Sequence, residues 1–180
     1  MKNDFIEKNV RTRLIIAGIN ELEERGIRDF SLRRVALRAE VSCAAPYRHF
    51  KDKEDFISEI IKYISSKWML LCHEVEKVFS SDKRRLIIEL AVANLRFWLA
   101  NANYRTVLMT LSTSSGDVLS DFDGPLINSV REWCALSGED AQTKIFTVRA
   151  LLYGCVMMTS SPDARSTLPD LLRRELEEIF

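Results

Sequence analysis

Apolar residues recur every three or four positions along almost the whole chain, a spacing typical of amphipathic helices. The pattern predicts a first helix over about 4–25, ended by Gly26. A much longer helix is expected over 53–79, because apolar residues repeat at helical spacing from Ile57 to Val78. At about 1.5 Å per residue it would span roughly 40 Å, enough to connect a small N-terminal head to a separate body. No segment shows the strict alternation of a strand, so the fold class is predicted to be all-α.

Two short helices separated by a tight turn are expected between these two elements. Ser31 is a suitable N-cap for the first of them, and Ser42 for the second, which should end near Phe50. Asp52 is a suitable N-cap for the long helix. The first three helices therefore have the order expected of a helix-turn-helix domain over residues 1–52.

The remaining residues, 53–180, are predicted to form a second, helical domain. After the long helix, further helices are expected over 83–100, 104–111, 126–136, 140–159 and 168–180, with polar loops over 112–125 and 160–167. Asp82 should cap the helix over 83–100, whose apolar residues lie almost all round it, and this helix is expected to be central. The chain should thus contain about nine helices.

Charge is distributed unevenly, although the formal net charge of the 180 residues is zero. Residues 1–50 contain ten Lys and Arg residues against seven Asp and Glu residues, which leaves +3 there and −3 in the remainder. This mild asymmetry agrees with a head that faces DNA and a body that avoids it.

Other function classes find little support. The four cysteines are widely spaced and lack zinc-type spacing, and no metal or other cofactor is expected. His49 and His73 are the only histidines, and no nucleophile motif or phosphate loop occurs, so the chain is not expected to be an enzyme. A polar start and the lack of a long apolar run favour a cytoplasmic protein without a membrane partner.

The chemistry of the head points to DNA. Arginine can bind a guanine edge or a phosphate, small residues permit close approach to the major groove, and Tyr, His and Lys can donate to phosphates. The candidate DNA-binding residues are Arg33, Arg34, Ser42, Cys43, Ala44, Ala45, Tyr47, Arg48, His49 and Lys53.

Residues 14–57 resemble the N-terminal DNA-binding domain of the tetracycline-repressor (TetR) family. The matching residues are Leu14, Ile15, Ala17, Ile19, Leu22, Gly26, Phe30, Ser31, Val35, Ala36, Ala39, Val41, Ser42, Tyr47, His49, Phe50, Lys53 and Glu54. The resemblance implies that Tyr47, His49 and Lys53 contact phosphates. It also implies that five residues face bases or the groove wall: Arg33, Cys43, Ala44, Ala45 and Arg48.

One position departs from the family pattern. Glu40 stands in the turn where the family usually has Gly. A left-handed backbone there would cost Glu on the order of 1 kcal/mol, and a slightly different turn is equally possible.

For the body, the resemblance implies a small-molecule pocket and a dimer interface formed by the last two helices. Candidate ligand contacts, chosen because large apolar and aromatic groups line such cavities, are Phe97, Trp98, Met109, Trp133, Tyr153 and Met157, with Asn94 to orient a polar group. Candidate dimer contacts are Ala150, Leu151, Gly154, Met158, Leu172 and Leu176. In both sets the alternative is an ordinary core face.

The leading hypothesis is a homodimeric repressor that a small hydrophobic or amphipathic effector releases from a palindromic double-stranded DNA operator. A redox-responsive regulator acting through Cys43 is a second hypothesis, since oxidation would add bulk in the DNA-facing helix. A DNA-independent helical adaptor is a third.

Overall fold

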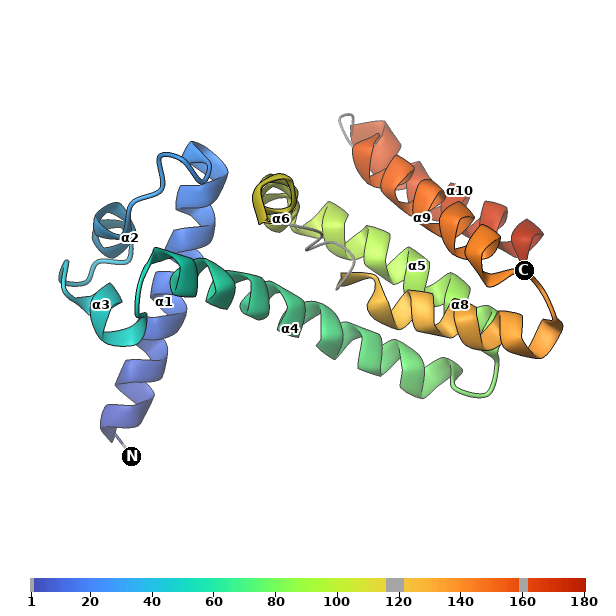
Figure 1. The fold of residues 1–180 in the computed structure, drawn as a ribbon, viewed down its shortest axis with the longest axis horizontal. Coiled ribbons are helices and arrows are strands. Elements are labelled where there is room, and N and C mark those ends of the chain that lie inside the picture. Colours follow the sequence, from blue (N-terminus) through green and yellow to red (C-terminus); the bar gives the residue numbers. More distant parts are fainter. Residues whose placement is uncertain (1, 116–121, 159–161) are drawn as a thin grey trace. The chain divides into compact units, whose positions relative to one another are not determined.

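The computed structural model describes residues 2–115, 122–158 and 162–180 (Figure 1). Within these ranges it forms nine helices and no strand, which confirms the all-α prediction. The helices are α1 (Lys2–Arg25), α2 (Leu32–Arg38), α3 (Ala45–His49), α4 (Lys53–Phe79), α5 (Lys83–Ala100), α6 (Ala102–Ser115), α8 (Gly124–Ser137), α9 (Ala141–Met157) and α10 (Pro162–Ile179).

Helix ends follow the predicted caps where the sequence offers a strong one. The carboxylates of Asp52, Asp82 and Asp140 accept hydrogen bonds from the backbone N–H three residues further on, at 2.8, 3.0 and 2.9 Å. Gly26 and Gly138 end α1 and α8 with φ of +68° and +77°, a conformation that glycine adopts without strain.

Helix also extends into segments that the sequence pattern predicts as loops. Helix α6 continues to Ser115, α8 begins at Gly124, and α10 begins at Pro162. Ser and Thr disfavour a helix by only a fraction of a kcal/mol each, up to about 0.7, and proline is tolerated in the first turn. The two loop predictions are therefore wrong for 112–115, 124–125 and 162–167, while residues 116–121 and 159–161 lie outside the described residues.

Packing divides the chain into two compact units. Unit one comprises Met1–Ser66 and Asn103–Val118, and it holds α1, α2, α3, α6 and the first part of α4. Unit two comprises Lys67–Ala102 and Leu119–Phe180, and it holds the rest of α4 together with α5, α8, α9 and α10. The expected functional boundary between residues 52 and 53 stays a prediction.

The head, residues 1–52 with the start of α4, encloses its own apolar core. Helix α1 packs on α2 and α3, and Leu14, Val35 and Phe56 are fully buried. The Phe56 ring lies 5.7 Å from that of Phe30 and 4.4 Å from that of Phe50, centroid to centroid. These three rings hold the start of α4 against the three-helix domain.

In unit two, α5 packs against α8, α9 and α10, so the prediction that this helix is central is confirmed. Four buried rings of unit two pack together and form what we call the aromatic cluster: Trp68 of α4, Phe97 and Trp98 of α5, and Phe122. The Trp68 indole N–H donates to the Phe122 carbonyl at 2.6 Å, which satisfies the polar atom within this apolar cluster.

Candidate nucleic-acid interface

The turn between α2 and α3 adopts the left-handed alternative at Glu40, whose φ is +54°. Two backbone hydrogen bonds close the turn, from Glu40 N–H to the Leu37 carbonyl at 3.1 Å and from Val41 N–H to the Ala36 carbonyl at 3.0 Å. This is the Schellman pattern that usually has glycine at the left-handed position. The turn therefore keeps the left-handed geometry that usually requires glycine, despite the glutamate.

Helix α3 is shorter than the sequence pattern predicts. It begins at Ala45, with Ala44 as its N-cap residue and no side-chain cap, so the prediction that Ser42 caps it is wrong. Instead, the Ser42 carbonyl accepts a hydrogen bond from the Ala45 N–H at 2.9 Å. Residues 43–44 form a turn ahead of the helix, and the only helical positions available are the five from Ala45 to His49.

A row of exposed side chains follows this turn and the outer face of α3. It consists of Ser42, Cys43, Ala44, Tyr47 and Arg48, and we call it the exposed row. Tyr47 is 64% exposed, which is unusual for so large a ring. Ala45 is only 8% exposed and does not belong to this row, and its contact with DNA stays a prediction.

The cations of the head fall into two groups. Arg33 on α2 and Arg48 on α3 are exposed, and among the residues that the structure describes neither has a hydrogen-bond or ion-pair partner. Lys51, which follows α3, is also exposed, and no partner is described for its ammonium. Sequence reasoning did not select Lys51, although its position just after Tyr47 and Arg48 could have indicated it.

The second group holds the head together. Arg34 donates to the buried Glu21 carboxylate at 2.5 Å and to the Asp29 carbonyl, and Arg38 binds Glu24 through both guanidinium nitrogens at 2.7 and 2.5 Å. The Arg38 hydrogen bonds hold the pKa of Glu24 below its usual range. Arg34 is a DNA-binding candidate in the sequence, but in the structure it ties α2 to α1 through Glu21.

Two further candidates lie at the start of α4 and just before it. The Lys53 ammonium donates to the Ile27 carbonyl at 2.8 Å and lies 5.6 Å from the Phe30 ring centroid. His49 is half-buried beside Phe50. An ammonium has three donors, so a phosphate contact by Lys53 remains compatible with this internal bond and stays a prediction.

Comparison with known proteins agrees with this geometry. The family model of bacterial regulatory proteins, tetR family, matches residues 14–60, which cover the helix-turn-helix and the start of α4. Residues 14–60 therefore match the N-terminal DNA-binding domain of the tetR family. This domain match supports a role in DNA-binding transcriptional regulation. No curated protein sequence matches the chain.

Solved structures of tetR-family type match nearly the full length. A Clostridium perfringens protein described as a fatty acid metabolism regulator is 14% identical with a TM-score of 0.79, covering 93% of this chain and 98% of that one. The Bacillus subtilis regulator FadR in complex with stearoyl-CoA is 16% identical with a TM-score of 0.73, covering 92% and 96%. A Rhodococcus sp. Rha1 transcriptional regulator is 21% identical with a TM-score of 0.68, covering 94% and 95%. At these identities the likeness establishes the fold.

The effector candidates differ in their surroundings. Phe97 and Trp98 belong to the aromatic cluster, and the Tyr153 hydroxyl donates to the buried Asp123 carboxylate at 2.9 Å. Asn94 is 1% exposed, and its Oδ1 has no hydrogen-bond partner among the described residues. The others lie apart: Met109 is in unit one, the Trp133 ring packs against Phe180, and Met157 is 67% exposed.

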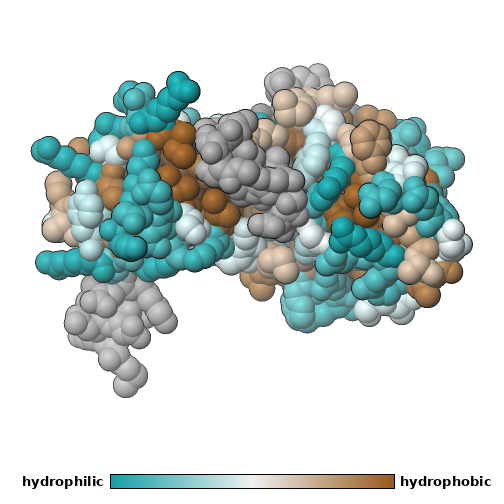
Figure 2. Space-filling view, in the orientation of Figure 1, coloured by the Kyte–Doolittle hydropathy of each residue, from teal (hydrophilic) through white to brown (hydrophobic). Residues whose placement is uncertain are grey.

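The candidate dimer contacts differ in exposure between α9 and α10. On α9, Ala150 and Met158 are exposed, and Leu151 and Gly154 are half-buried. Figure 2 shows hydrophobic residues at the surface among hydrophilic ones where α9 lies in Figure 1. On α10, Leu172 and Leu176 are 1% and 0% exposed because they fill the core of unit two, and their place in a dimer interface stays a prediction.

Two kinds of feature are absent from the described residues. Within the described residues no helix is long and apolar enough to cross a membrane. The same residues contain no group of three or more His, Cys, Asp or Glu side chains arranged to hold a metal ion.

Proposed function

We propose that the protein is a homodimeric repressor that binds a palindromic operator and is released from it by a small hydrophobic or amphipathic ligand. The exposed row is the observation that carries the proposal. Small side chains at Cys43 and Ala44 permit close approach to a groove, while Tyr47 and Arg48 supply donors for phosphates and bases.

A dimer is favoured by the small size of the reading element and by the surface of α9. A helix of five residues contacts few base pairs, and two copies about 34–36 Å apart would meet successive turns of the major groove. Phe146, Met157 and Met158 on α9 are 73%, 67% and 65% exposed, an amount of apolar surface that a second copy would cover. A groove of about 420 Å³ beside Phe146 and Tyr153 would receive side chains of that copy.

The proposed effector response depends on α4. This helix continues without a break from unit one, where its start packs in the head, into unit two, where Trp68 packs in the aromatic cluster. A ligand that displaces α4 in unit two would change the spacing of the two heads in a dimer and hence their operator affinity. The stearoyl-CoA bound to FadR is an amphipathic ligand of the proposed kind.

Selection of bound sequences from a random duplex pool at fixed salt tests the proposal. We expect a palindrome, with binding lost in Tyr47→Ala. Arg48→Ala should also weaken binding and lower the salt dependence by about one released ion. Lys62→Ala, which removes an exposed cation paired with Glu59 at 2.9 Å outside the exposed row, is the matched control and should bind normally.

If the folded, dimeric protein enriches no sequence from the pool, the result would contradict the proposal and favour the adaptor hypothesis. An adaptor should bind its partner protein with little dependence on salt or on Tyr47.

A redox response through Cys43 is a second candidate function, favoured by one observation. Cys43 is the exposed thiol, whereas Cys72 and Cys134 are buried, and burial raises the pKa of Cys72 to about 12. Because the thiolate is the reactive form, oxidant should reach Cys43 first. Loss of DNA binding under peroxide that persists in Cys43→Ser would contradict this function.

A further inference from the structure

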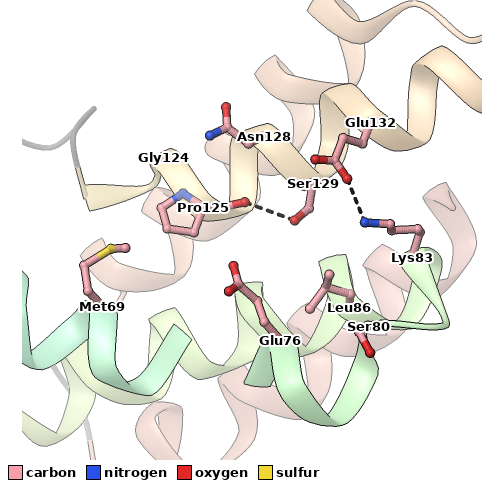
Figure 3. Close-up of a pocket in the computed structure, with 10 residues that line it drawn as sticks. All are labelled: Met69, Glu76, Ser80, Lys83, Leu86, Gly124, Pro125, Asn128, Ser129 and Glu132. Atoms are coloured by element: carbon pink, nitrogen blue, oxygen red, sulfur yellow. Dashed lines mark hydrogen bonds and ion pairs between the residues drawn. The ribbon is translucent and has the colours of Figure 1, made fainter. Parts of the chain in front are cut away.

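We propose that a cleft in unit two binds a protonated primary amine with an apolar tail, and that such an amine is an effector of this protein. The second claim, that the amine acts as an effector, is the regulatory half of this inference and rests on the proposed function. The cleft has a volume of about 560 Å³, within the usual range for small-molecule sites. Its walls come from the second part of α4, the start of α5 and the first half of α8 (Figure 3).

An uncompensated carboxylate lies in this cleft. At one end, the Lys83 ammonium binds the Glu132 carboxylate at 2.7 Å, so these two charges neutralise each other. Glu76 points from α4 into the cleft, and among the described residues it has no hydrogen-bond or ion-pair partner. The neighbouring Lys77 does not compensate it, because its ammonium binds Glu74 at 2.8 Å.

The hydroxyl group that lines the cleft from the facing helix does not donate a hydrogen bond to Glu76. The Ser129 hydroxyl, on the facing helix α8, donates instead to the Pro125 carbonyl at 3.1 Å. Glu76 is half-buried, so part of its hydration is already lost. A cation with an N–H group would supply the Glu76 carboxylate with both an opposite charge and a hydrogen-bond donor.

The lining distinguishes among cations. None of the described residues that line the cleft is aromatic, so a quaternary ammonium would find no cation–π surface there, and it has no N–H to donate to the Glu76 carboxylate. A primary ammonium has three N–H donors for the Glu76 carboxylate. A carboxylate ligand would be repelled by Glu76.

The opposite end of the cleft suits an apolar tail. Met69 and Pro125 lie there, and Leu86 contributes further apolar surface (Figure 3). Met69 is 49% exposed, so covering it removes apolar surface from water. Its unbranched side chain can adapt to tails of different shape.

Such a ligand would touch both α4 and α8 at once, through Glu76 and Met69 on one side and Pro125 on the other. Occupancy would therefore bias the position of α4 relative to α8 within unit two. Because α4 also forms part of the head, the same ligand would change operator affinity if the proposed function holds.

Titration calorimetry of the full chain with octylammonium chloride tests the site directly. We expect saturable 1:1 binding at neutral pH, at least about tenfold tighter than binding of octanoate or octyltrimethylammonium, the scale of one charge-assisted hydrogen bond. Glu76→Gln should weaken octylammonium binding by about tenfold. Glu74→Gln, a matched charge change on the same helix outside the cleft, should bind as the unaltered protein does.

Equal affinity of Glu76→Gln and the unaltered protein, or equal affinity for octanoate, would overturn the site. A second measurement separates the two proposals: release of the selected operator by octylammonium, in the unaltered protein and in Glu76→Gln. Amine binding without operator release would overturn the regulatory half, whereas failure to select any operator would overturn the proposed function and leave the binding result standing.

Discussion

Gly18 on α1 lies so close to the Phe56 ring on α4 that a β-carbon added at Gly18 would stand 2.3 Å from Cε1 and 2.7 Å from Cζ. The ring cannot easily move away, because Phe30 and Phe50 pack against it. The missing side chain at Gly18 therefore sets the distance between α1 and the start of α4, on which the position of the helix-turn-helix depends.

Gly18→Ala should consequently lower the free energy of unfolding by about 1–3 kcal/mol, because overpacking outweighs the gain in helix propensity. Urea denaturation measures this change. Gly124→Ala is the control, since a β-carbon there meets no atom within 4 Å. Equal stability of the two variants would show that the Phe56 ring moves aside at little cost.

The sequence predicts the elements whose signals are local. Asp52, Asp82, Asp140 and the two left-handed glycines mark helix ends through bonds to residues at most four positions away, so the pattern locates those ends closely. The head also resembles a family with a fixed motif, and all five residues of the exposed row are among the candidates selected from the sequence.

Features that depend on tertiary packing escape such reasoning. Leu172 and Leu176 have the composition of a dimer face, but α10 turns them toward α5. Arg33 and Arg34 are adjacent in sequence. Among the described contacts, only Arg34 donates to Glu21, thirteen residues earlier in the chain. No local pattern distinguishes these outcomes, since each depends on which helix lies opposite.

The left-handed Glu40 offers a direct test of backbone strain. Glu40→Gly should raise the free energy of unfolding by about 1 kcal/mol, because glycine adopts this conformation without a Cβ clash. The ion pair lost with Arg13 is long, at 3.7 Å, and exposed, so it should contribute little. Glu40→Ala removes the same ion pair and keeps the strain, and a midpoint equal to that of Glu40→Gly in urea denaturation would contradict the argument.

The bond between Arg34 and Glu21 predicts a stability effect where sequence reasoning predicted only DNA contact. Arg34→Ala should lower the free energy of unfolding by roughly 1–3 kcal/mol, less than for a fully buried pair because Arg34 is itself half exposed. Glu21 would then keep only the Arg38 contact at 3.8 Å. A double-mutant cycle with Glu21→Gln measures the coupling between the two residues, and additive effects would contradict it.

The ion pair between Glu89 on α5 and Arg173 on α10 predicts how stability depends on pH. Arg173 donates to both carboxylate oxygens at 2.6 and 2.8 Å, which lowers the pKa of Glu89 below its usual range. A carboxyl with a lowered folded-state pKa contributes its full stabilisation above the unfolded value, about 4.3. That contribution is lost as the pH falls through the folded-state pKa.

Glu89→Gln should therefore be less stable than the unaltered protein at pH 7, by roughly 1–3 kcal/mol. The difference should shrink steadily below about pH 4.3, because protonation removes the same charge from the unaltered protein. Urea denaturation at pH 7, 5, 4 and 3 measures both curves. Glu178→Gln, a change at an exposed position of α10, controls for general charge effects and should follow the unaltered protein throughout. A constant gap between Glu89→Gln and the unaltered protein down to pH 3 would mean that the lost stability comes from packing between α5 and α10 rather than from the charge of Glu89.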